Sequence, residues 1–284
     1  MIPLAAAQLD LFQYSLVDNF FSMTVATMGA AALFFFLSRS EVAAKYRPAL
    51  MVSGIVCTIA AYHYFMIRGS WQAAYQYEAG TGNTGAYIAS GKSFNDFYRY
   101  ADWILTVPLL MVELVTVLAL SKDVARPLLF RLVVAAALMI GLGYPGEISQ
   151  DWTTRLVWGL LSSVPFFYIL YVLWVELSAS LDNQPVAARP LISLARLVLL
   201  VTWAVYPIAY AIHGDALDGA VPGLMKGKYE QSVVGIQVGY AVADILAKAG
   251  FGVLIYMIAA RKTEAMGPAE RPDTVGGRPV AAMA

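Results

Sequence analysis

The sequence predicts an all-α membrane protein built as a bundle of seven transmembrane helices. Its 284 residues are 60% hydrophobic and 13% charged, with a mean hydropathy of +0.64. A soluble domain is roughly 25% charged, so most of this chain should face lipid. Stretches with few or no charges, each close to the roughly 20 residues that cross a bilayer, recur along it. They cover residues 19–38, 48–67, 98–121, 127–146, 156–175, 197–214 and 231–260.

The basic residues predict an outward N-terminus and a cytoplasmic C-terminus. With this orientation twelve Lys and Arg residues lie on the cytoplasmic side and six on the outer side. Membrane proteins carry such an excess of basic residues in their cytoplasmic loops. The third helix should therefore run from outside to inside.

Two segments outside the spans have a distinct composition. Residues 70–94 place aromatic runs on both sides of a Gly- and Asn-rich centre, which predicts a short extracellular β-hairpin between the second and third helices. Residues 263–284 are rich in Pro, Gly, Ala and charge, and we expect a disordered cytoplasmic tail behind a membrane domain of residues 1–262. The start of the chain lacks a basic signal-peptide region, so the first span should be retained.

Composition also argues against several classes of partner. The formal net charge is zero and no basic stripe is present, so no nucleic-acid partner is expected. Cys57 is the single cysteine and there are only two His residues. We therefore expect neither an internal disulfide nor a bound metal.

Ionisable residues inside the spans are few: Asp102 and Glu113 on the third, and Asp244 and Lys248 on the seventh. In "ADWILTVPLLMVE" the positions of Asp102, Thr106 and Glu113 fall on nearly the same helix face. The two carboxyl groups are separated by about 16 Å along the axis. Asp244 and Lys248 are one turn apart on the same face.

A charge balance suggests which of these groups are ionised. Arg99 and Lys248 can compensate Asp102 and Asp244, whereas Glu113 has only uncharged helical neighbours. Burial disfavours the charged form of a carboxyl group, so we expect Glu113 to hold a proton that it can donate, and Asp102 to be ionised and able to accept one. A single intramembrane Asp is often only a packing hydrogen bond, but four such groups in phase on two helices favour a function.

Several motifs resemble those of one known family. "RYADWILTVPLLMVE" is similar to the third helix of microbial (type 1) rhodopsins, and "DILAKAGFG" to their seventh helix with its retinal-binding lysine. "AAYHYFMIRGSW", "YILYVLW" and "WAVYPIAY" resemble the second, fifth and sixth helices. The likeness covers residues 14–260. "GYPGEIS" and the Thr-Val-Pro form of the third-helix motif are most similar to the xanthorhodopsin-like subgroup, neighbours of the proteorhodopsins.

The resemblance implies a light-driven outward proton pump, a transporter rather than an enzyme, in the inner membrane of a prokaryote. Lys248 would form a protonated Schiff base with all-trans retinal, a step that suits a buried amine beside carboxylates. Asp102 would be counterion and proton acceptor, Asp244 the second counterion, and Glu113 the cytoplasmic proton donor. Thr106 completes the Asp-Thr-Glu triplet of proton pumps, which disfavours chloride and sodium transport.

The resemblance also assigns neighbours to these groups. His63 would contact Asp102 and make the colour pH-dependent, although a histidine at this depth is more often a packing residue. The retinal pocket would contain Tyr64, Tyr100, Trp103, Leu110, Trp203, Tyr206 and Pro207. From spacing alone most of these aromatics would be packing residues or interfacial anchors. Leu110 implies green absorption.

Gly159 stands where many relatives carry tryptophan. In the xanthorhodopsin-like subgroup such a glycine admits a carotenoid antenna, so a hydroxylated carotenoid is an optional second chromophore. The alternative is that Gly159 only permits close helix contact. A homo-oligomer, pentamer or trimer, is also expected.

Two other functions stay open. A sensory photoreceptor of the same fold would use Lys248 and Asp102 but often lacks a carboxylate donor, so Glu113 favours the pump. A proton-coupled transporter without pigment is the alternative from another class. The outer acids Glu147, Asp151, Asp215 and Asp218 are candidates for a proton exit route, and the sequence does not choose among them.

Overall fold

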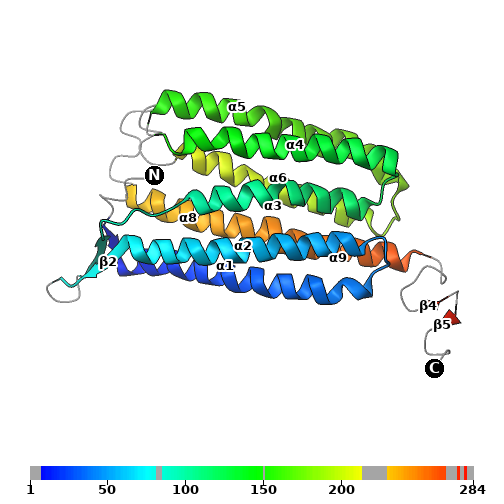
Figure 1. Ribbon diagram of the computed structural model, residues 1–284, viewed down its shortest axis with the longest axis horizontal. Helices are drawn as coiled ribbons and strands as arrows, with labels where there is room; N and C mark the ends of the chain where they lie inside the picture. Colours follow the sequence, from blue (N-terminus) through cyan, green and yellow to red (C-terminus); the bar gives the residue numbers. More distant parts are fainter. Residues whose placement is uncertain are drawn as a thin grey trace.

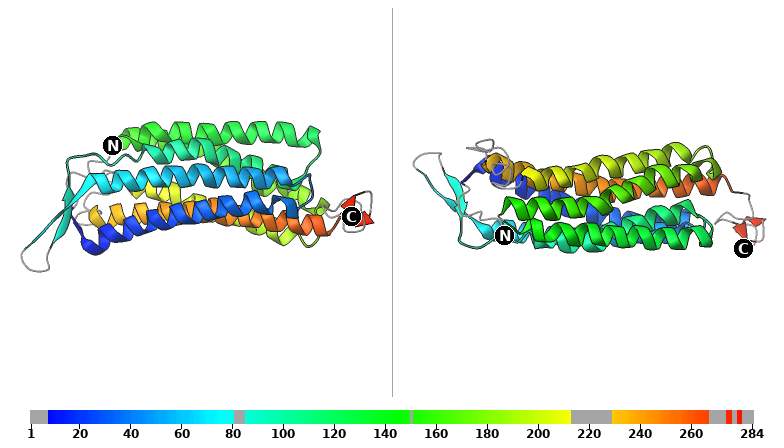
Figure 2. Two further views of the ribbon diagram at one scale, coloured as in Figure 1. Left: turned by 60° about the horizontal axis from the view of Figure 1, so that its bottom comes forward. Right: turned by 90° about the horizontal axis from the view of Figure 1, so that it is seen from above.

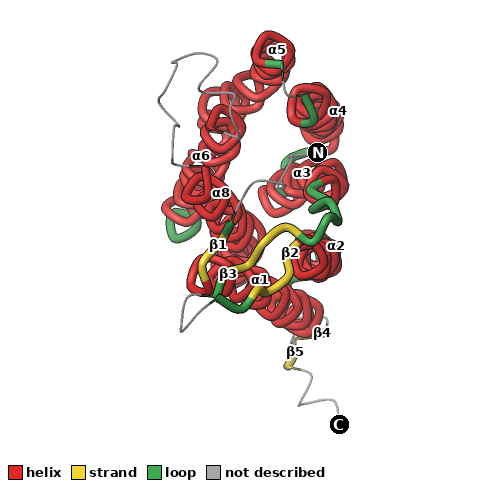
Figure 3. The backbone as a smooth tube through the Cα atoms, turned by 90° about the vertical axis from the view of Figure 1, so that its left-hand side faces the viewer, coloured by secondary structure: helices red, strands yellow, loops and turns green. Residues whose placement is uncertain are grey.

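The seven predicted spans form a bundle of roughly parallel and antiparallel helices (Figure 1). The computed structural model describes residues 8–80, 85–149, 151–212 and 229–266, and two short strands. Within this part of the chain seven helical segments are long and apolar enough to cross a membrane. Viewed along the bundle, successive helices follow one another around a ring, and the seventh segment packs against the first and sixth (Figure 3). The predicted fold class is confirmed.

The spans are built from one or several helical elements. The first four are α1 (Leu11–Ser38, followed by η2, Arg39–Glu41), α2 (Arg47–Ala74), α3 (Phe97–Leu118) and α4 (Lys122–Glu147). The fifth comprises α5 (Trp152–Tyr171), the π-helical η3 (Val172–Glu176) and the 3₁₀ element η4 (Leu177–Asn183). The sixth is α6 (Arg189–Ile212), and the seventh joins α8 (Tyr229–Asp244), the π-helical η5 (Ile245–Gly250) and α9 (Phe251–Glu264).

Most helices extend beyond the apolar stretches that predicted them. α6 begins at Arg189, whereas the apolar stretch began at residue 197. Arg189 and Arg196 interrupt the apolar pattern but not the helix, because their guanidinium groups donate to the carbonyls of Gln184 and Leu173. Helical backbone therefore continues past the point where hydropathy alone marks a boundary.

The predicted hairpin is present and gains a third strand. β2 (Tyr75–Glu78) and β3 (Ala86–Ala89) pair antiparallel between α2 and α3. β1 (Leu9–Asp10) pairs with the other edge of β3, giving the order β1-β3-β2. Two residues are too few for an alternating pattern, so the sequence could not predict β1. Asp10 also begins α1, where its side chain accepts from the Gln13 amide.

The two ends of the bundle carry different short strands, which give them the names hairpin end and tail end. The hairpin end holds β2 and β3, and the tail end holds β4 (Thr274–Val275) and β5 (Arg278–Pro279) (Figures 1 and 2). α9 continues to Glu264, two residues past the predicted limit of the membrane domain. Most of the predicted tail, 263–284, lies outside the described residues.

α3 and the seventh span lie deepest in the bundle. Of their apolar windows 61% is buried, against 17% for the fifth span. The two helices that carry intramembrane charge are therefore the two best shielded from lipid. This placement is what ionisable groups at membrane depth require.

Candidate functional site

The seventh span brings its lysine to the carboxylates of two helices. Lys248 lies in the π-helical turn η5, a type of local widening that is frequent at functional sites. Its Nζ donates to Oδ2 of Asp102 on α3 and lies 2.9 Å from Oδ1 of Asp244. None of the three residues is more than 2% exposed. A buried ammonium is stabilised by such a pair of anions.

Asp244 is held by groups from three other helices. Tyr64 on α2 donates to Oδ2 at 2.7 Å and Tyr206 on α6 donates to Oδ1 at 2.6 Å. The indole Nε1 of Trp103 on α3 lies 3.5 Å from Oδ2. Both oxygens of Asp244 therefore accept hydrogen bonds in addition to the contact with Lys248, which fixes this carboxylate as an anion.

Only one of the two carboxylate oxygens of Asp102 accepts a hydrogen bond from the described residues. Its Oδ2 accepts from Lys248, whereas the buried Oδ1 has no hydrogen-bond partner in the described part of the chain. His63 lies close by, with its Nδ1 4.0 Å from Oδ1 of Asp102 and 2.9 Å from the carbonyl of Ile59. His63 is thus a neighbour of Asp102 rather than a hydrogen-bond partner, and Oδ1 is free to receive a proton.

Arg99 pairs with neither Asp102 nor Asp244, the two carboxylates that the charge balance predicted as its partners. Its Nε donates to Asp96 at 2.7 Å, and its two terminal nitrogens donate to Tyr64 (3.3 Å) and to Gln237. Arg99 reaches Asp244 only through the Tyr64 hydroxyl. Sequence reasoning missed Asp96, which precedes α3 and looks like a solvated loop acid, and Gln237, an isolated amide on α8.

Glu113 occupies an apolar site nearer the tail end. It is fully buried, the Ser53 hydroxyl on α2 contacts its Oε1, and Oε2 has no partner among the described residues. Ser53 also lies 3.1 Å from the carbonyl of Ala49. A hydroxyl has one proton to donate, so both contacts are satisfied if Glu113 is protonated and donates to Ser53 while Ser53 donates to Ala49. Nothing in the sequence around Ser53 indicated this role.

Thr106 lies on α3 between the two carboxyl groups. Its hydroxyl donates to the carbonyl of Asp102 at 2.9 Å. That bond stays within α3, and no hydrogen bond joins the Thr106 side chain to either carboxyl group in the described structure. Thr106 therefore supports the backbone that carries Asp102.

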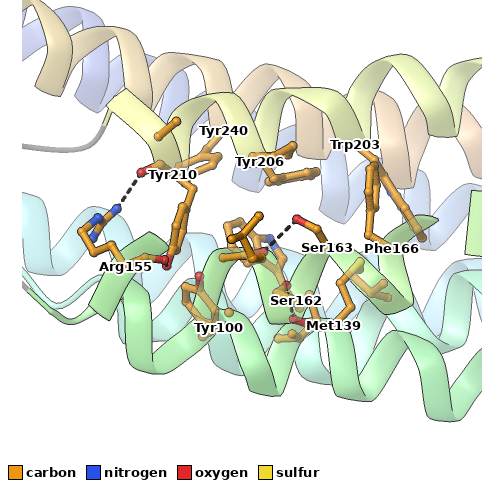
Figure 4. A pocket seen from close by; sticks show the side chains of 18 of the residues that line it. Tyr100, Met139, Arg155, Ser162, Ser163, Phe166, Trp203, Tyr206, Tyr210 and Tyr240 are labelled. Atoms are coloured by element: carbon orange, nitrogen blue, oxygen red, sulfur yellow. Dashed lines mark hydrogen bonds between the residues drawn. The ribbon is translucent and has the colours of Figure 1, made fainter. Parts of the chain in front are cut away.

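A cavity of about 250 Å³ extends from Lys248 between α3, α4, α5 and α6. Figure 4 shows its wall, with the Trp203 and Phe166 rings toward one end and Tyr210 toward the other. The predicted pocket residues that line it are Tyr100, Trp103, Leu110, Gly159, Trp203, Tyr206 and Pro207. Tyr64 does not line it and instead contacts the far side of Asp244. Sequence reasoning missed the lining residues Met139, Ser162, Ser163, Phe166, Tyr210 and Tyr240.

Beside Gly159 the cavity reaches the outer surface of α5. A Cβ on Gly159 would lie only 3.0 Å from Cε1 of Tyr210, so the glycine lets the Tyr210 ring pack closely against α5. Leu156 and Leu160 line the same part of the cavity and are 44% and 61% exposed on the outside of the bundle.

The candidate exit acids differ in their surroundings. Glu147 lies 3.5 Å from the buried Arg155 guanidinium, which also donates to the Tyr210 carbonyl at 2.6 Å. Asp151 is exposed and caps α5, and hydrogen bonding from Thr154 lowers the pKa of its carboxyl. Asp215 and Asp218 lie outside the described residues.

Comparison with known proteins agrees with this architecture. The family described as bacteriorhodopsin-like protein matches residues 15–262. Green-light absorbing proteorhodopsin from Gamma-proteobacterium EBAC31A08 is 31% identical over 258 residues, 90% of each chain.

Two solved structures are similar over nearly their whole length. Xanthorhodopsin, described as a light-driven ion pump with dual chromophore, is 49% identical, with a TM-score of 0.82 over 91% of this chain and 98% of its own. Thermophilic rhodopsin is 45% identical, with a TM-score of 0.82 over 92% of this chain and 99% of its own. The chain therefore belongs to the bacteriorhodopsin-like family and is a microbial (type 1) rhodopsin.

Proposed function

We propose that this protein is a light-driven proton pump that binds retinal through Lys248 and moves protons outward. The observation that carries the proposal is the buried Lys248 amine, which lies between two carboxylates at the wall of an aromatic cavity. The names of the relatives support it, since they are light-absorbing proteorhodopsins and a light-driven ion pump.

The cavity suits a long apolar aldehyde. Lys248 offers a primary amine at its wall, and Trp103, Trp203 and Tyr206 offer flat apolar surfaces along it. Primary amines condense with carbonyl groups, and the carboxylates stabilise the cation that results. When bound, retinal would supply light absorption and an isomerisation that disturbs the contacts of Nζ.

The two neighbouring carboxylates then differ in what they can do with the proton on Nζ. Oδ2 of Asp102 contacts Nζ, and its Oδ1 accepts no hydrogen bond from the described residues. Asp102 can therefore take up a proton on Oδ1 without breaking an existing hydrogen bond. Protonating Asp244 would break a short bond from Tyr64 or Tyr206. We therefore assign Asp102 as the acceptor and Asp244 as the fixed counterion.

Glu113 would return a proton to Nζ from the other side. It is buried in its neutral form against Ser53, so it stores a proton until the amine has lost its own. Asp102 lies near the start of α3 at the hairpin end and Glu113 near its other end. The excess of basic residues toward the other end supports an outward-facing hairpin end, and in that orientation release from Asp102 and supply by Glu113 give outward transport.

We further propose that the opening beside Gly159 admits a hydroxylated carotenoid. The exposed Leu156 and Leu160 border the opening, and the ring of Tyr210 lies directly behind the glycine. A carotenoid lying there should transfer excitation to the cavity. Energy transfer measured in excitation spectra should disappear in Gly159→Trp, while direct excitation of the retinal band still drives pumping. Equal transfer in the variant would refute this antenna.

The experiment that tests the main proposal is expression with retinal, followed by an absorption spectrum and a pH electrode under illumination. A coloured protein that acidifies the medium in light, with the effect abolished by a protonophore, is expected. A coloured protein without acidification would identify a photoreceptor, and a protein that stays colourless would refute retinal binding.

A further inference from the structure

The tail end of the bundle holds a buried lysine that the pumping steps leave unused. Lys262 on α9 is 4% exposed, and its Nζ donates to the carbonyls of Val117 (2.8 Å) and Leu118 (2.7 Å), the last residues of α3. The ring of Tyr46 lies on another side, 5.0 Å from Nζ. No carboxylate of the described chain pairs with this ammonium, so its ligands are backbone carbonyls and an aromatic face.

The lysine is the centre of a junction between four segments. Next to it, Thr263 accepts a hydrogen bond from the Ala43 amide in the α1–α2 connection (3.0 Å). Gln184, which follows η4, donates to the same Leu118 carbonyl at 3.4 Å. We call Lys262, Thr263 and Gln184, with the groups that they bind, the tail-end clamp. It ties the seventh span to α3 and to two connecting segments.

The backbone of α3 ends in an unusual conformation at this clamp. Ala119 follows the helix with φ 51°, in the left-handed region that residues other than Gly rarely adopt. Helices leave their last carbonyls without intrahelical partners. Here the Ala119 amide donates to the Thr116 carbonyl, whereas Lys262 donates to the carbonyls of Val117 and Leu118. Lys262 therefore compensates a backbone geometry that the sequence at position 119 does not favour.

The clamp covers the route to Glu113. Glu113 lies one helical turn before Val117, and the intervening Leu114 and Val115 are buried. The Val117 and Leu118 carbonyls that bind Lys262 lie on α3 between Glu113 and the tail end. Separation of α3 from α9 at this end would break these bonds and expose the region next to Glu113 to water.

We propose that Lys262 is a positioning residue that keeps the tail end of α3 closed over Glu113, and that its release opens the proton uptake path. The gating role rests on the proposed pump function, because it needs Glu113 to be the donor. The clamp itself does not depend on that function, because it is defined by contacts in the structure. The clamp closes between turnovers, so that Glu113 keeps its proton until it is needed.

The first test measures hydrogen–deuterium exchange in the dark on the full retinal-bound protein in lipid nanodiscs. Lys262→Met keeps the apolar chain and removes the donors, Lys262→Arg keeps donors, and Lys122→Met removes one exposed charge at the start of α4. Exchange in peptides 42–46 and 114–121 should be roughly tenfold faster in Lys262→Met, the effect of losing bonds to a charged donor. Lys262→Arg should restore protection and Lys122→Met should match wild type.

The second test follows the infrared carboxylic-acid band of Glu113 after a flash. This band should return roughly tenfold faster in Lys262→Met, because the hydrogen bonds from Lys262 to the end of α3 are lost. In Lys262→Arg and Lys122→Met it should return at the wild-type rate. A purely structural lysine would leave this return unchanged.

Equal dark exchange in wild type and Lys262→Met would overturn the clamp, as would equal acceleration in Lys122→Met. Faster exchange with an unaltered return of the Glu113 band would overturn the gating role. Light-driven acidification by wild type is recorded in parallel, so a failure of the proposed function would be seen separately from these results.

Discussion

Asp102 and Glu113 lie on the same face of α3, but the bundle surrounds them differently. At Asp102, the seventh span supplies a cation, and Asp244 with its two tyrosines lies beside it. At Glu113, the Ser53 hydroxyl on α2 contacts Oε1, and Oε2 has no hydrogen-bond partner among the described residues. One site stabilises an anion and the other a neutral acid.

The difference shows that a carboxyl group's task is set by its neighbours on other helices. The face that α3 presents is common to both groups, and their separation follows from helix geometry alone. The protonation state depends on whether Lys248 or Ser53 is the partner. A lysine favours the carboxylate, whereas a single shared hydroxyl in an apolar site favours the acid.

The largest effect should come from removing the cation on the Asp102 side. Lys248→Ala deletes the amine that we propose binds retinal and removes the ammonium that lies between Asp102 and Asp244. Colour and light-driven pumping should both be lost completely, as judged by the visible spectrum and a pH electrode. Lys122→Ala is the control and should keep both. A coloured, pumping Lys248→Ala protein would refute the assignment of the site.

Changing Glu113 should separate the two regions. Glu113→Gln removes the stored proton but no charge near Lys248. Return of the proton to Nζ after a flash should be slowed about 100-fold, the usual contribution of a positioned acid, while the absorption maximum stays in place. Asp102→Asn should instead shift the maximum, because it removes an anion beside Nζ. If Glu113→Gln shifted the colour as far as Asp102→Asn does, the two sites would not be independent.

The partner of Glu113 should have a smaller effect. Ser53→Ala removes the hydroxyl that, among the described residues, is the hydrogen-bond partner of the Glu113 side chain and can donate to the carboxylate once Glu113 gives up its proton. Donation should be slowed roughly five- to tenfold, the value of one hydrogen bond. Ser53→Thr keeps the hydroxyl and should restore most of the rate. Flash photolysis measures both variants, and an unchanged rate in Ser53→Ala would show that Ser53 does not assist.

The smallest effect should come from an exposed carboxylate outside the membrane. Asp151 caps α5, and hydrogen bonding from Thr154 lowers the pKa of its carboxyl in the folded protein. Because this pKa is below the unfolded value, the stabilisation is present above the ordinary pKa of about 4 and is lost as pH falls through the lowered pKa.

Thermal unfolding of wild type and Asp151→Ala tests that expectation. The two midpoints should differ slightly at pH 7 and converge as the pH falls through the lowered pKa of Asp151. Asp151→Asn keeps an oxygen acceptor without the titration, so its midpoint should lack this pH dependence. A wild-type advantage that grows in acid would contradict the sign of the shift.

The sequence predicted the parts of this structure that depend on local pattern. Seven spans, the hairpin and the shared face of Asp102 and Glu113 all follow from hydropathy, turn composition and helix period. The convergence of Lys248 with Asp102 and Asp244 was predicted from charge compensation and the family resemblance. Few other ionisable groups lie inside the predicted spans, so few other charge pairings were available.

The parts that the sequence did not predict depend on side chains brought together from distant segments. Ser53 and Glu113 are 60 positions apart, and Arg99 and Gln237 are 138 apart. A serine or glutamine in a long helix has no local mark that distinguishes a site residue from a packing residue. Arg99 binds Asp96 because the start of α3 carries that carboxylate within reach, a nearer anion than Asp102.

The most direct test of the account is the resting infrared spectrum of the retinal-bound protein in its carboxylic-acid region, compared across two variants. We predict a protonated-carboxyl band that disappears in Glu113→Gln and persists in Asp102→Asn. A band that persists in Glu113→Gln and disappears in Asp102→Asn would reverse the roles of the two carboxyl groups and contradict the account.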